Sequence, residues 1–365
     1  MLTRLKIENF RGLNELSLTN TGRVNLIVGR NDTGKTSLLE AMRLLLSGDP
    51  RHLRRIVRNR MERRPTDLSQ DYRLAFYQAH SDDPLLISGI VSGIALSAQA
   101  KIREVQGEEA LPFDLESDGD TSEDVTSLLQ PGHEIVVEVT ANDQAKAIIR
   151  QPLQGRSAAA ARSQRQFLNG SFPDVPPLVW LGTNRAEVWS HTRRYSELYR
   201  NGGADMLLTI LKDIEPRLRS LVVLTMKRDD AFAPIAVLEA DLGFDQTLPL
   251  ESMGDGFSNV ISILSAIGAA RKGLCLIDEI DNGIHYSLLT QLWRSIRSAA
   301  DAYDSQVWAT THSYDCVAAV YEALNDTPDA LRVHRLERRT DGAVVVHTFD
   351  HAMLGRALES GLEVR

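Results

Sequence analysis

Residues 29–37, GRNDTGKTS, have the residue types and the spacing of a loop that binds nucleotide phosphates. Gly29 and Gly34 would let the backbone wrap around phosphate oxygens, with the N–H groups pointing inward. Lys35 is predicted to reach the β- and γ-phosphates, and the Thr36 hydroxyl to bind Mg²⁺. We therefore predict that every residue of this loop contacts nucleotide: Gly29, Arg30, Asn31, Asp32, Thr33, Gly34, Lys35, Thr36 and Ser37.

A second stretch, GLCLIDEIDN at residues 273–282, reads as an apolar strand that ends in acidic residues. Asp278 at the strand end is predicted to hold the Mg²⁺ shell through water, beside Thr36. Glu279 is placed to orient or deprotonate an attacking water. Asp281 and Asn282 fall at the following turn, where an Asn-Gly pair is also common for conformational reasons alone, so their role stays open.

A third stretch, QVWATTHSYD at residues 306–315, reads as another buried strand followed by a histidine. A histidine at the carboxyl end of a strand, in a sheet that binds nucleotide at those ends, can donate a hydrogen bond to the γ-phosphate. We predict this role for His312, although an isolated histidine is more often structural.

The stretch PLESMGDGFSNVISIL, residues 249–264, turns from polar and glycine-rich to apolar. Glycines at a helix start leave backbone N–H groups open to an anion. This predicts a second anion-binding helix start, through Ser252, Gly254, Asp255 and Gly256, more than 200 residues after the phosphate loop.

The elements that carry these residues alternate between strands and helices. Apolar strands are predicted at 24–28, 273–277 and 306–310, and helices at 35–47, 206–221, 257–270 and 286–299. Such alternation indicates an α/β fold with a largely parallel sheet. We divide the chain into residues 1–64, which begin the core, an inserted β and helical region at 65–205, and residues 206–365, which complete the core.

Composition is that of an ordinary globular protein, with 43% hydrophobic and 25% charged residues among 365. The first residues alternate and resemble no export signal, and Cys275 and Cys316 are predicted to be small core residues, so we expect a cytoplasmic location.

The net charge of −8 conceals a strong asymmetry along the chain. Residues 51–64 hold seven arginines and one glutamate, whereas residues 104–124 hold nine acidic residues and no basic one. Such blocks are often solvated faces. Arginine also pairs well with phosphate oxygens, so DNA binding is the second interpretation of the basic block. It would act through Arg51, Arg54, Arg55 and Arg58.

The order of phosphate loop, Ser-x-Gly segment, Asp-Glu strand and Thr-His-Ser strand resembles the ABC-type ATPases of the RecF, SMC and OLD class. The opening LTRLKIENFRGLNEL is similar to the start of that class, and IDEIDNGIHYSLL and ATTHS resemble the ATPase domains of OLD proteins and their stand-alone relatives. The resemblance covers residues 1–48 and 245–365 well and the middle poorly. It implies an ATPase head with a mostly parallel sheet, an antiparallel β subdomain and a helical subdomain.

The resemblance also implies a role for the second helix start. In such ATPases two protomers face head to tail, and each lends its serine-glycine segment to the γ-phosphate held by the other. The segment SMGDG departs from the usual Leu-Ser-Gly-Gly-Gln-like run, since Met253 and Asp255 differ. A glutamine that senses Mg²⁺ is expected as well, and Gln78 is the candidate.

We therefore expect a Mg-ATP-dependent homodimerising switch that acts in DNA maintenance or in defence against phage and plasmids. Because the chain extends only about 50 residues past His312, any nuclease or toxin activity would belong to a separate partner. The alternatives are a RecF-like DNA-binding clamp without an effector enzyme, and a scaffold that binds ATP without turnover, against which the intact Glu279 argues.

Overall fold

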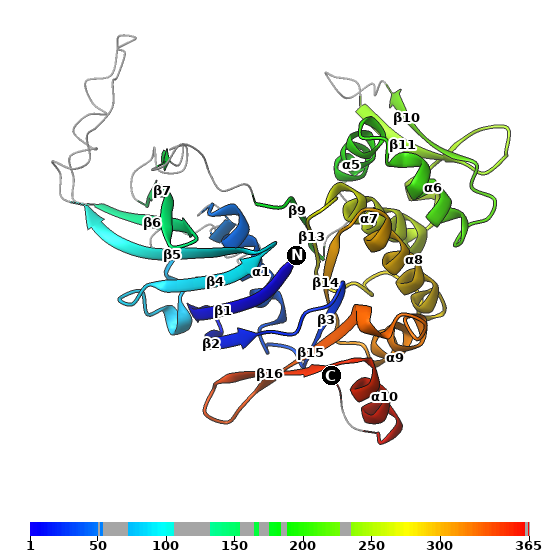
Figure 1. Cartoon of the computed structure of the whole chain (residues 1–365). Coiled ribbons are helices and arrows are strands. Elements are labelled where there is room, and N and C mark those ends of the chain that lie inside the picture. Colours follow the sequence, from blue (N-terminus) through cyan, green and yellow to red (C-terminus); the bar gives the residue numbers. More distant parts are fainter. Residues whose placement is uncertain are drawn as a thin grey trace, which may run out of the picture.

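The computed structural model describes residues 1–49, 52–53, 72–105, 132–153, 164–167, 175–183, 188–226, 235–361 and 364. These residues form three sheets with helices packed around them. Figure 1 shows a large antiparallel sheet on the left, helices on the right, and the parallel sheet between them. In the described part of the chain, no helix is long and apolar enough to cross a membrane.

The central sheet has six strands in the order β16-β15-β3-β14-β13-β9, and all neighbours are parallel except β15 and β16. Three strands are buried along their whole length, which explains their continuous apolar sequences. The strands are β3 (Val24–Val28), β9 (Leu178–Leu181), β13 (Leu274–Ile277), β14 (Gln306–Thr310), β15 (Leu331–Arg338) and β16 (Val344–Phe349).

The antiparallel sheet has seven strands in the order β2-β1-β4-β5-β6-β7-β8, and a small third sheet has the order β10-β11-β12. The larger sheet contains β1 (Leu2–Phe10), β2 (Leu13–Leu18), β4 (Leu85–Val91), β5 (Ile94–Val105), β6 (Gly132–Ala141), β7 (Gln144–Pro152) and β8 (Gln164–Phe167). The smaller one contains β10 (Ser220–Met226), β11 (Ile235–Asp241) and β12 (Leu248–Pro249).

The described α-helices are α1 (Lys35–Ser47), α5 (Val188–Arg200), α6 (Ala204–Lys212), α7 (Asp255–Ala269), α8 (Leu289–Ala302), α9 (Tyr314–Ala323) and α10 (His351–Glu359). Short 3₁₀ turns lie at η1 (Tyr77–Ala79), η3 (Leu250–Met253), η4 (Tyr286–Leu288) and η5 (Pro328–Ala330).

Two hydrophobic cores lie on opposite faces of the central sheet. Alternate strand residues point to opposite sides, so that Leu26 joins the helical core while Ile27 joins the core beneath the antiparallel sheet. The first core contains residues of α5 to α10, and the second contains α1 and the inner face of the antiparallel sheet. The central sheet is thereby covered on both faces, and its strand ends are held rigidly for the site.

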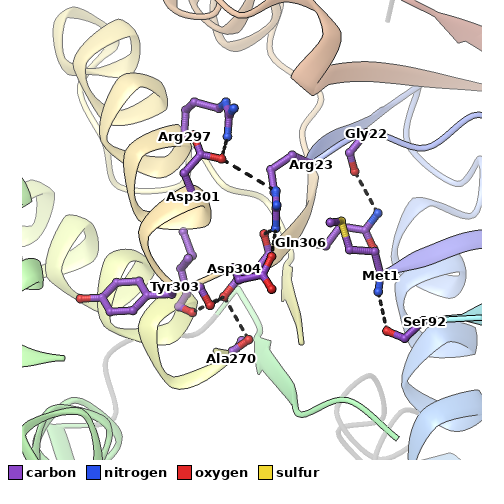
Figure 2. A network of polar contacts seen from close by, with 12 residues as sticks. Met1, Gly22, Arg23, Ser92, Ala270, Arg297, Asp301, Tyr303, Asp304 and Gln306 are labelled. Carbon is purple, nitrogen blue, oxygen red and sulfur yellow. Dashed lines mark hydrogen bonds and ion pairs between the residues drawn. The ribbon is translucent and has the colours of Figure 1, made fainter. Parts of the chain in front are cut away.

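A polar network ties the start of the chain to β14 at the amino end of the central sheet (Figure 2). The side chain of Gln306 accepts a hydrogen bond from the Leu2 N–H (2.8 Å) and donates to the carbonyls of Leu2 (3.1 Å) and Gly22 (2.9 Å). Arg23 donates to Asp304 (2.8 Å) close by. The network therefore joins the antiparallel sheet to the central sheet at the end opposite to the phosphate loop.

The predicted fold class is confirmed, with a mostly parallel sheet, an antiparallel β region and a helical region. The proposed division near residues 64 and 205 stays a prediction, although two sheets cross it: β1 pairs with β4, and β9 pairs with β13. Cys275 and Cys316 are both buried, as predicted.

The predicted helix at 206–221 is wrong in its extent. Helix α6 ends at Lys212, and strand β10 already begins at Ser220. Pro216 lies between them, and proline cannot continue a helix because it has no N–H group and its ring clashes with the preceding turn. The sequence analysis did not anticipate α5.

A buried histidine in the central sheet gives the first testable prediction. Burial, together with the charge of Arg332, lowers the pKa of His334 from 6.5 to about 3. The ring stacks on Trp308 and shares hydrogen bonds with Thr348 (3.0 Å) and Asn25 (3.4 Å). The folded protein therefore holds this ring neutral, whereas the unfolded chain protonates it below about pH 6.5.

The free energy of unfolding should therefore fall as the pH drops from 6.5 towards 3, by up to about 1.4 kcal/mol per pH unit from this residue alone. The substitution His334→Gln should flatten the curve of unfolding free energy against pH in this range, measured by urea denaturation. The control is the exposed His80, which lies outside the central sheet: His80→Gln should leave the slope unchanged. Equal slopes for wild type and His334→Gln would contradict the prediction.

Candidate nucleotide-binding site

The phosphate loop joins β3 to α1, with glycine wherever another residue would not fit. Gly29 has φ 150°, and a Cβ there would lie 2.6 Å from the Leu336 carbonyl oxygen. Gly34 has φ 95°, and a Cβ would lie 2.7 Å from a methyl group of Leu13. Asp32 also has a positive φ, 66°. The loop therefore has the tight turn that its sequence predicts, at the amino end of α1.

Lys35 folds back over the loop from the first turn of α1. Its Nζ donates to the carbonyl oxygens of Gly29 (2.7 Å) and Arg30 (2.9 Å). Burial lowers the pKa of Lys35, and the negative charges of Asp278 and Glu279 partly oppose this effect. The ammonium group is thus held above the loop with two carboxylates nearby, where a polyphosphate would need a cation.

Thr36 and Asp278 meet although they are 242 residues apart in the sequence. The Thr36 hydroxyl lies 3.2 Å from both carboxylate oxygens of Asp278, which is buried. Strands β3 and β13 flank β14 and run parallel to it, so their carboxyl ends reach the same edge of the sheet. The structure brings together the two residues predicted to hold Mg²⁺.

Glu279 follows Asp278 with its backbone in the left-handed region, at φ 49°. Its N–H donates to the Thr310 hydroxyl at 2.8 Å, and the same hydroxyl lies 2.7 Å from Asp278 Oδ1. Glu279 is half-buried. Glu279 is therefore at the predicted edge of the sheet.

His312 lies just beyond β14 and is exposed. The N–H of the preceding residue, Thr311, donates to the Ile27 carbonyl at 3.1 Å, which places His312 beside the start of the phosphate loop. The Thr311 hydroxyl donates to Asp281 (2.6 Å) and accepts from the Ser313 N–H (3.0 Å). Asp281 thus has a contact at this edge of the sheet.

The second helix start is present at the amino end of α7. Gly254 is exposed, has φ 85°, and is the N-cap residue of α7. No side chain at this position accepts a hydrogen bond from the first N–H groups of the helix. Ser252 and Asp255 are exposed as well. A Cβ added at Gly256 would lie 3.8 Å from the Gly283 carbonyl oxygen. The Asn259 side-chain amide donates a hydrogen bond to the Asn282 carbonyl at 3.3 Å. The segment therefore lies beside the turn that follows Glu279.

Gln78 does not belong to a strand of the central sheet. It is exposed in the short turn η1, which precedes β4 of the antiparallel sheet. Gly182 and Thr183 instead follow β9, whose last carbonyl, on Leu181, accepts from the Asp278 N–H at 2.8 Å. The topology thus brings Thr183 close to Asp278, and the role of Gln78 at Mg²⁺ stays a prediction.

The arginines predicted to contact DNA lie outside the described residues, namely Arg51, Arg54, Arg55 and Arg58.

Residues that the sequence analysis missed also contribute to the site. Thr310 and Thr311 belong to the stretch already singled out for His312, but their contacts depend on neighbouring strands. Arg338, at the end of β15, donates to the carbonyls of Asp32 (3.0 Å) and Gly342 (3.1 Å), so it braces the phosphate loop. Arg11 forms an ion pair with Glu40 of α1. Sequence spacing gives no signal for Arg338, which lies 306 residues from Asp32.

The arrangement of oxygen atoms at the strand ends fits a magnesium site. Hydroxyl and carboxylate oxygens converge at Thr36 and Asp278, and these are the ligands that Mg²⁺ prefers. Among the described residues, no group of three or more His, Cys, Asp or Glu side chains could hold a metal by itself.

Two family models match most of the chain. One, described as an AAA ATPase domain, matches residues 1–113. The other, described as an AAA domain, putative AbiEii toxin, Type IV TA system, matches residues 150–317. The first contains the phosphate loop, and the second contains Asp278, Glu279 and His312.

Curated proteins with similar sequences include three from different organisms. An uncharacterized protein of Methanocaldococcus jannaschii is 49% identical over 47 residues, which are 13% of this chain and 22% of that protein. An ATP/GTP phosphatase of Helicobacter pylori is 20% identical over 344 residues, 89% of each chain. The DNA replication and repair protein RecF of Shewanella baltica is 25% identical over 204 residues, 56% of this chain and 47% of that protein. The match therefore spans less than half the length of the Methanocaldococcus jannaschii protein and of RecF.

Among solved structures, the SMC head bound to the C-winged helix domain of ScpA has a TM-score of 0.50 with this chain. The match covers 98% of this chain and 99% of that one at 15% identity, which shows a common fold. Together, the two AAA domain models, the fold shared with the SMC head and the similarity to RecF support an ABC-type ATPase of the RecF and SMC class. The two AAA domain models and the similarity to an ATP/GTP phosphatase support ATP hydrolysis as its activity. The narrower placement among OLD proteins stays a prediction.

Proposed function

We propose that the chain is a Mg-ATP-dependent switch that dimerises when ATP binds and reopens after hydrolysis. The observation that carries this proposal is the exposed amino end of α7. The first N–H groups of α7 have no side-chain cap, and a Cβ added at Gly254 would meet nothing within 4 Å. Uncapped N–H groups and the helix dipole favour an anion, and the γ-phosphate held by a second copy would supply it.

Asp255 bears directly on this proposal. An acidic residue in the first turn stabilises a helix, but it would repel a phosphate placed against the same turn. Because its side chain is exposed, it can turn away from the anion. Ser252 and the N–H groups around Gly254 then remain as the donors. The turn 281–283, which packs beside Gly256, would lie in the same interface.

Within each site the residues have separate roles. Gly29 to Ser37 wrap the phosphates, and Lys35 neutralises their charge. Thr36 would bind Mg²⁺ directly and Asp278 would bind it through water, and the ion would supply charge neutralisation at the γ-phosphate. Glu279 takes a proton from, or orients, the attacking water. His312 donates a hydrogen bond to the γ-phosphate.

The biological setting we propose is DNA maintenance or defence against phage and plasmids, with a separate effector such as a nuclease or toxin. The description of the second family model, which mentions a putative toxin and a Type IV TA system, supports the defence setting. The alternative is a RecF-like DNA-binding clamp, which the similarity to RecF supports. Stimulation of ATP hydrolysis by DNA that depends on Arg51, Arg54, Arg55 and Arg58 would favour the clamp.

The proposed switch predicts that self-association depends on nucleotide. Sedimentation velocity of the purified chain should show a shift towards twice the monomer mass when Mg-ATP is added, and no shift with Mg-ADP, which has no γ-phosphate for the second copy to bind. EDTA added with ATP should prevent the shift. A monomer that binds ATP without any change in mass would rule out composite sites, and a stable oligomer indifferent to nucleotide would rule out the switch.

A further inference from the structure

Thr310, the last residue of β14, contacts three consecutive residues of the Asp-Glu segment. Its hydroxyl donates to Asp278 Oδ1 (2.7 Å) and accepts from the Glu279 N–H (2.8 Å), while its carbonyl accepts from the Ile280 N–H (2.9 Å). A hydroxyl has one proton to donate, so accepting from Glu279 leaves that proton for Asp278. The side chain is completely buried, and both bonds therefore form away from competing water.

The backbone of Glu279 requires such support. Its φ of 49° lies in the left-handed region, which is unfavourable for a residue with a long side chain and persists only where surrounding contacts fix it. The bond from its N–H to Thr310 holds the peptide from one side, and the bond from the Asn282 N–H to the Glu279 carbonyl (3.0 Å) holds it from the other. These two bonds set the direction in which the carboxylate leaves the backbone.

Asp278 receives hydrogen bonds from two threonines of different kinds. Thr36 belongs to the phosphate loop, is half-buried, and lies 3.2 Å from both carboxylate oxygens. Thr36 would bind Mg²⁺ through an oxygen lone pair, which would leave its proton for Asp278. Thr310 is buried in the sheet, and its distance to Asp278 (2.7 Å) is half an ångström shorter than that of Thr36. Thr310 therefore keeps the Asp278 carboxylate oriented.

The next residue extends this support to the histidine. The Thr311 hydroxyl donates to Asp281 and accepts from the Ser313 N–H, so that one side chain brackets His312 and the turn after Glu279. The end of β14 therefore contacts the Asp-Glu segment through Thr310, and the following turn and Ser313 through Thr311.

We infer that Thr310 is a positioning residue for hydrolysis, which holds the Asp278 carboxylate towards the metal and the Glu279 carboxylate towards the attacking water. This inference rests on the proposed roles of Asp278 and Glu279. Thr310 touches neither nucleotide nor water, and it acts through these two residues. Its loss should therefore slow the chemical step much more than it weakens ATP binding.

The test compares three substitutions at one position in the full chain. Thr310→Val keeps the shape and removes the hydroxyl, Thr310→Ala does so without adding a methyl group against the carboxylate, and Thr310→Ser keeps the hydroxyl. The two variants without a hydroxyl should lower kcat by about 10- to 100-fold, because a buried acceptor and a buried donor both lose their partner. The affinity for a fluorescent ATP analogue should change by less than about threefold, and Thr310→Ser should restore most of kcat.

Thr348→Val is the matched control, since it removes another threonine hydroxyl from the central sheet, and kcat should be unchanged. Binding of the fluorescent analogue reports which variants are folded. If Thr310→Val does not bind the analogue, the kcat of Thr310→Ala decides the test. Wild-type kcat in a binding-competent Val or Ala variant would overturn the inference, as would a Thr310→Ser variant as slow as Thr310→Ala. A wild-type chain without ATP hydrolysis would overturn the proposed function instead.

Discussion

Replacing Lys35 with alanine is expected to abolish measurable ATP hydrolysis. Lys35 is held over the phosphate loop by the carbonyls of Gly29 and Arg30, and Asp278 and Glu279 lie close enough to influence its pKa. Without its charge, less positive charge would offset the repulsion between these two carboxylates and the phosphates. Losing one such electrostatic contact typically costs about 10²- to 10³-fold in rate, and here weaker nucleotide binding adds to the loss.

The measurement is phosphate release at saturating Mg-ATP, with binding of a fluorescent ATP analogue measured in parallel. Lys6→Ala is a suitable control, because Lys6 is a half-buried lysine on β1 that pairs with Glu8 at 2.7 Å instead of lying in the loop. Its activity should match that of the wild type. Turnover by Lys35→Ala at the wild-type rate would remove the phosphate-loop assignment.

The substitution Glu279→Gln is expected to trap the dimer. Glutamine keeps the size of the side chain and removes the charge that activates water, so hydrolysis should fall by about 10²- to 10⁴-fold. ATP should still bind, because Lys35, Thr36 and Asp278 are unchanged. Since the proposed closed state lasts until hydrolysis, light scattering should show a dimer that persists in Mg-ATP for much longer than the wild-type dimer.

A second substitution in the same chain tests where the dimer forms. Ser252→Arg places a long cation at the exposed start of α7, where the proposed interface has no room for it. Glu279→Gln with Ser252→Arg should stay monomeric in Mg-ATP while binding the nucleotide analogue. Ser360→Arg, which changes an exposed serine at the end of α10, should leave the trapped dimer intact. A double mutant that still dimerises would contradict the role of Ser252.

The strands and loops of the site were predictable where local chemistry alone determines them. Gly29 and Gly34 are required by turns that no larger residue fits, and the apolar runs before Asp278 and Thr311 belong to strands buried on both faces. Because parallel strands end at one edge, placing these runs in one sheet was enough to predict that Thr36 and Asp278 meet.

What could not be predicted depends on strand order, which the spacing of residues does not encode. Arg338 reaches Asp32 because β15 lies next to β3, and Thr310 reaches Asp278 because β14 lies next to β13. Gln78 was predicted from its residue type alone, because the sequence does not show which strand lies beside β13. The topology instead leads to the end of β9, where the sequence has Gly182 and Thr183. The end of α6 was missed because the apolar period continues past Lys212, although Pro216 prevents a helix there.

The position of β3 between β14 and β15 also constrains how the chain can fold. Residues 24–28 must wait for residues 306–310 and 331–335 before their backbone groups find partners. Contacts so distant in sequence close late and slowly, and they leave apolar strands exposed in the meantime. The phosphate loop is made early during synthesis, yet Arg338, which contacts it at Asp32, is made more than 300 residues later. Nucleotide can therefore stabilise the complete site only after residues 306–338 have been made, and it cannot help residues 24–47 to fold before then.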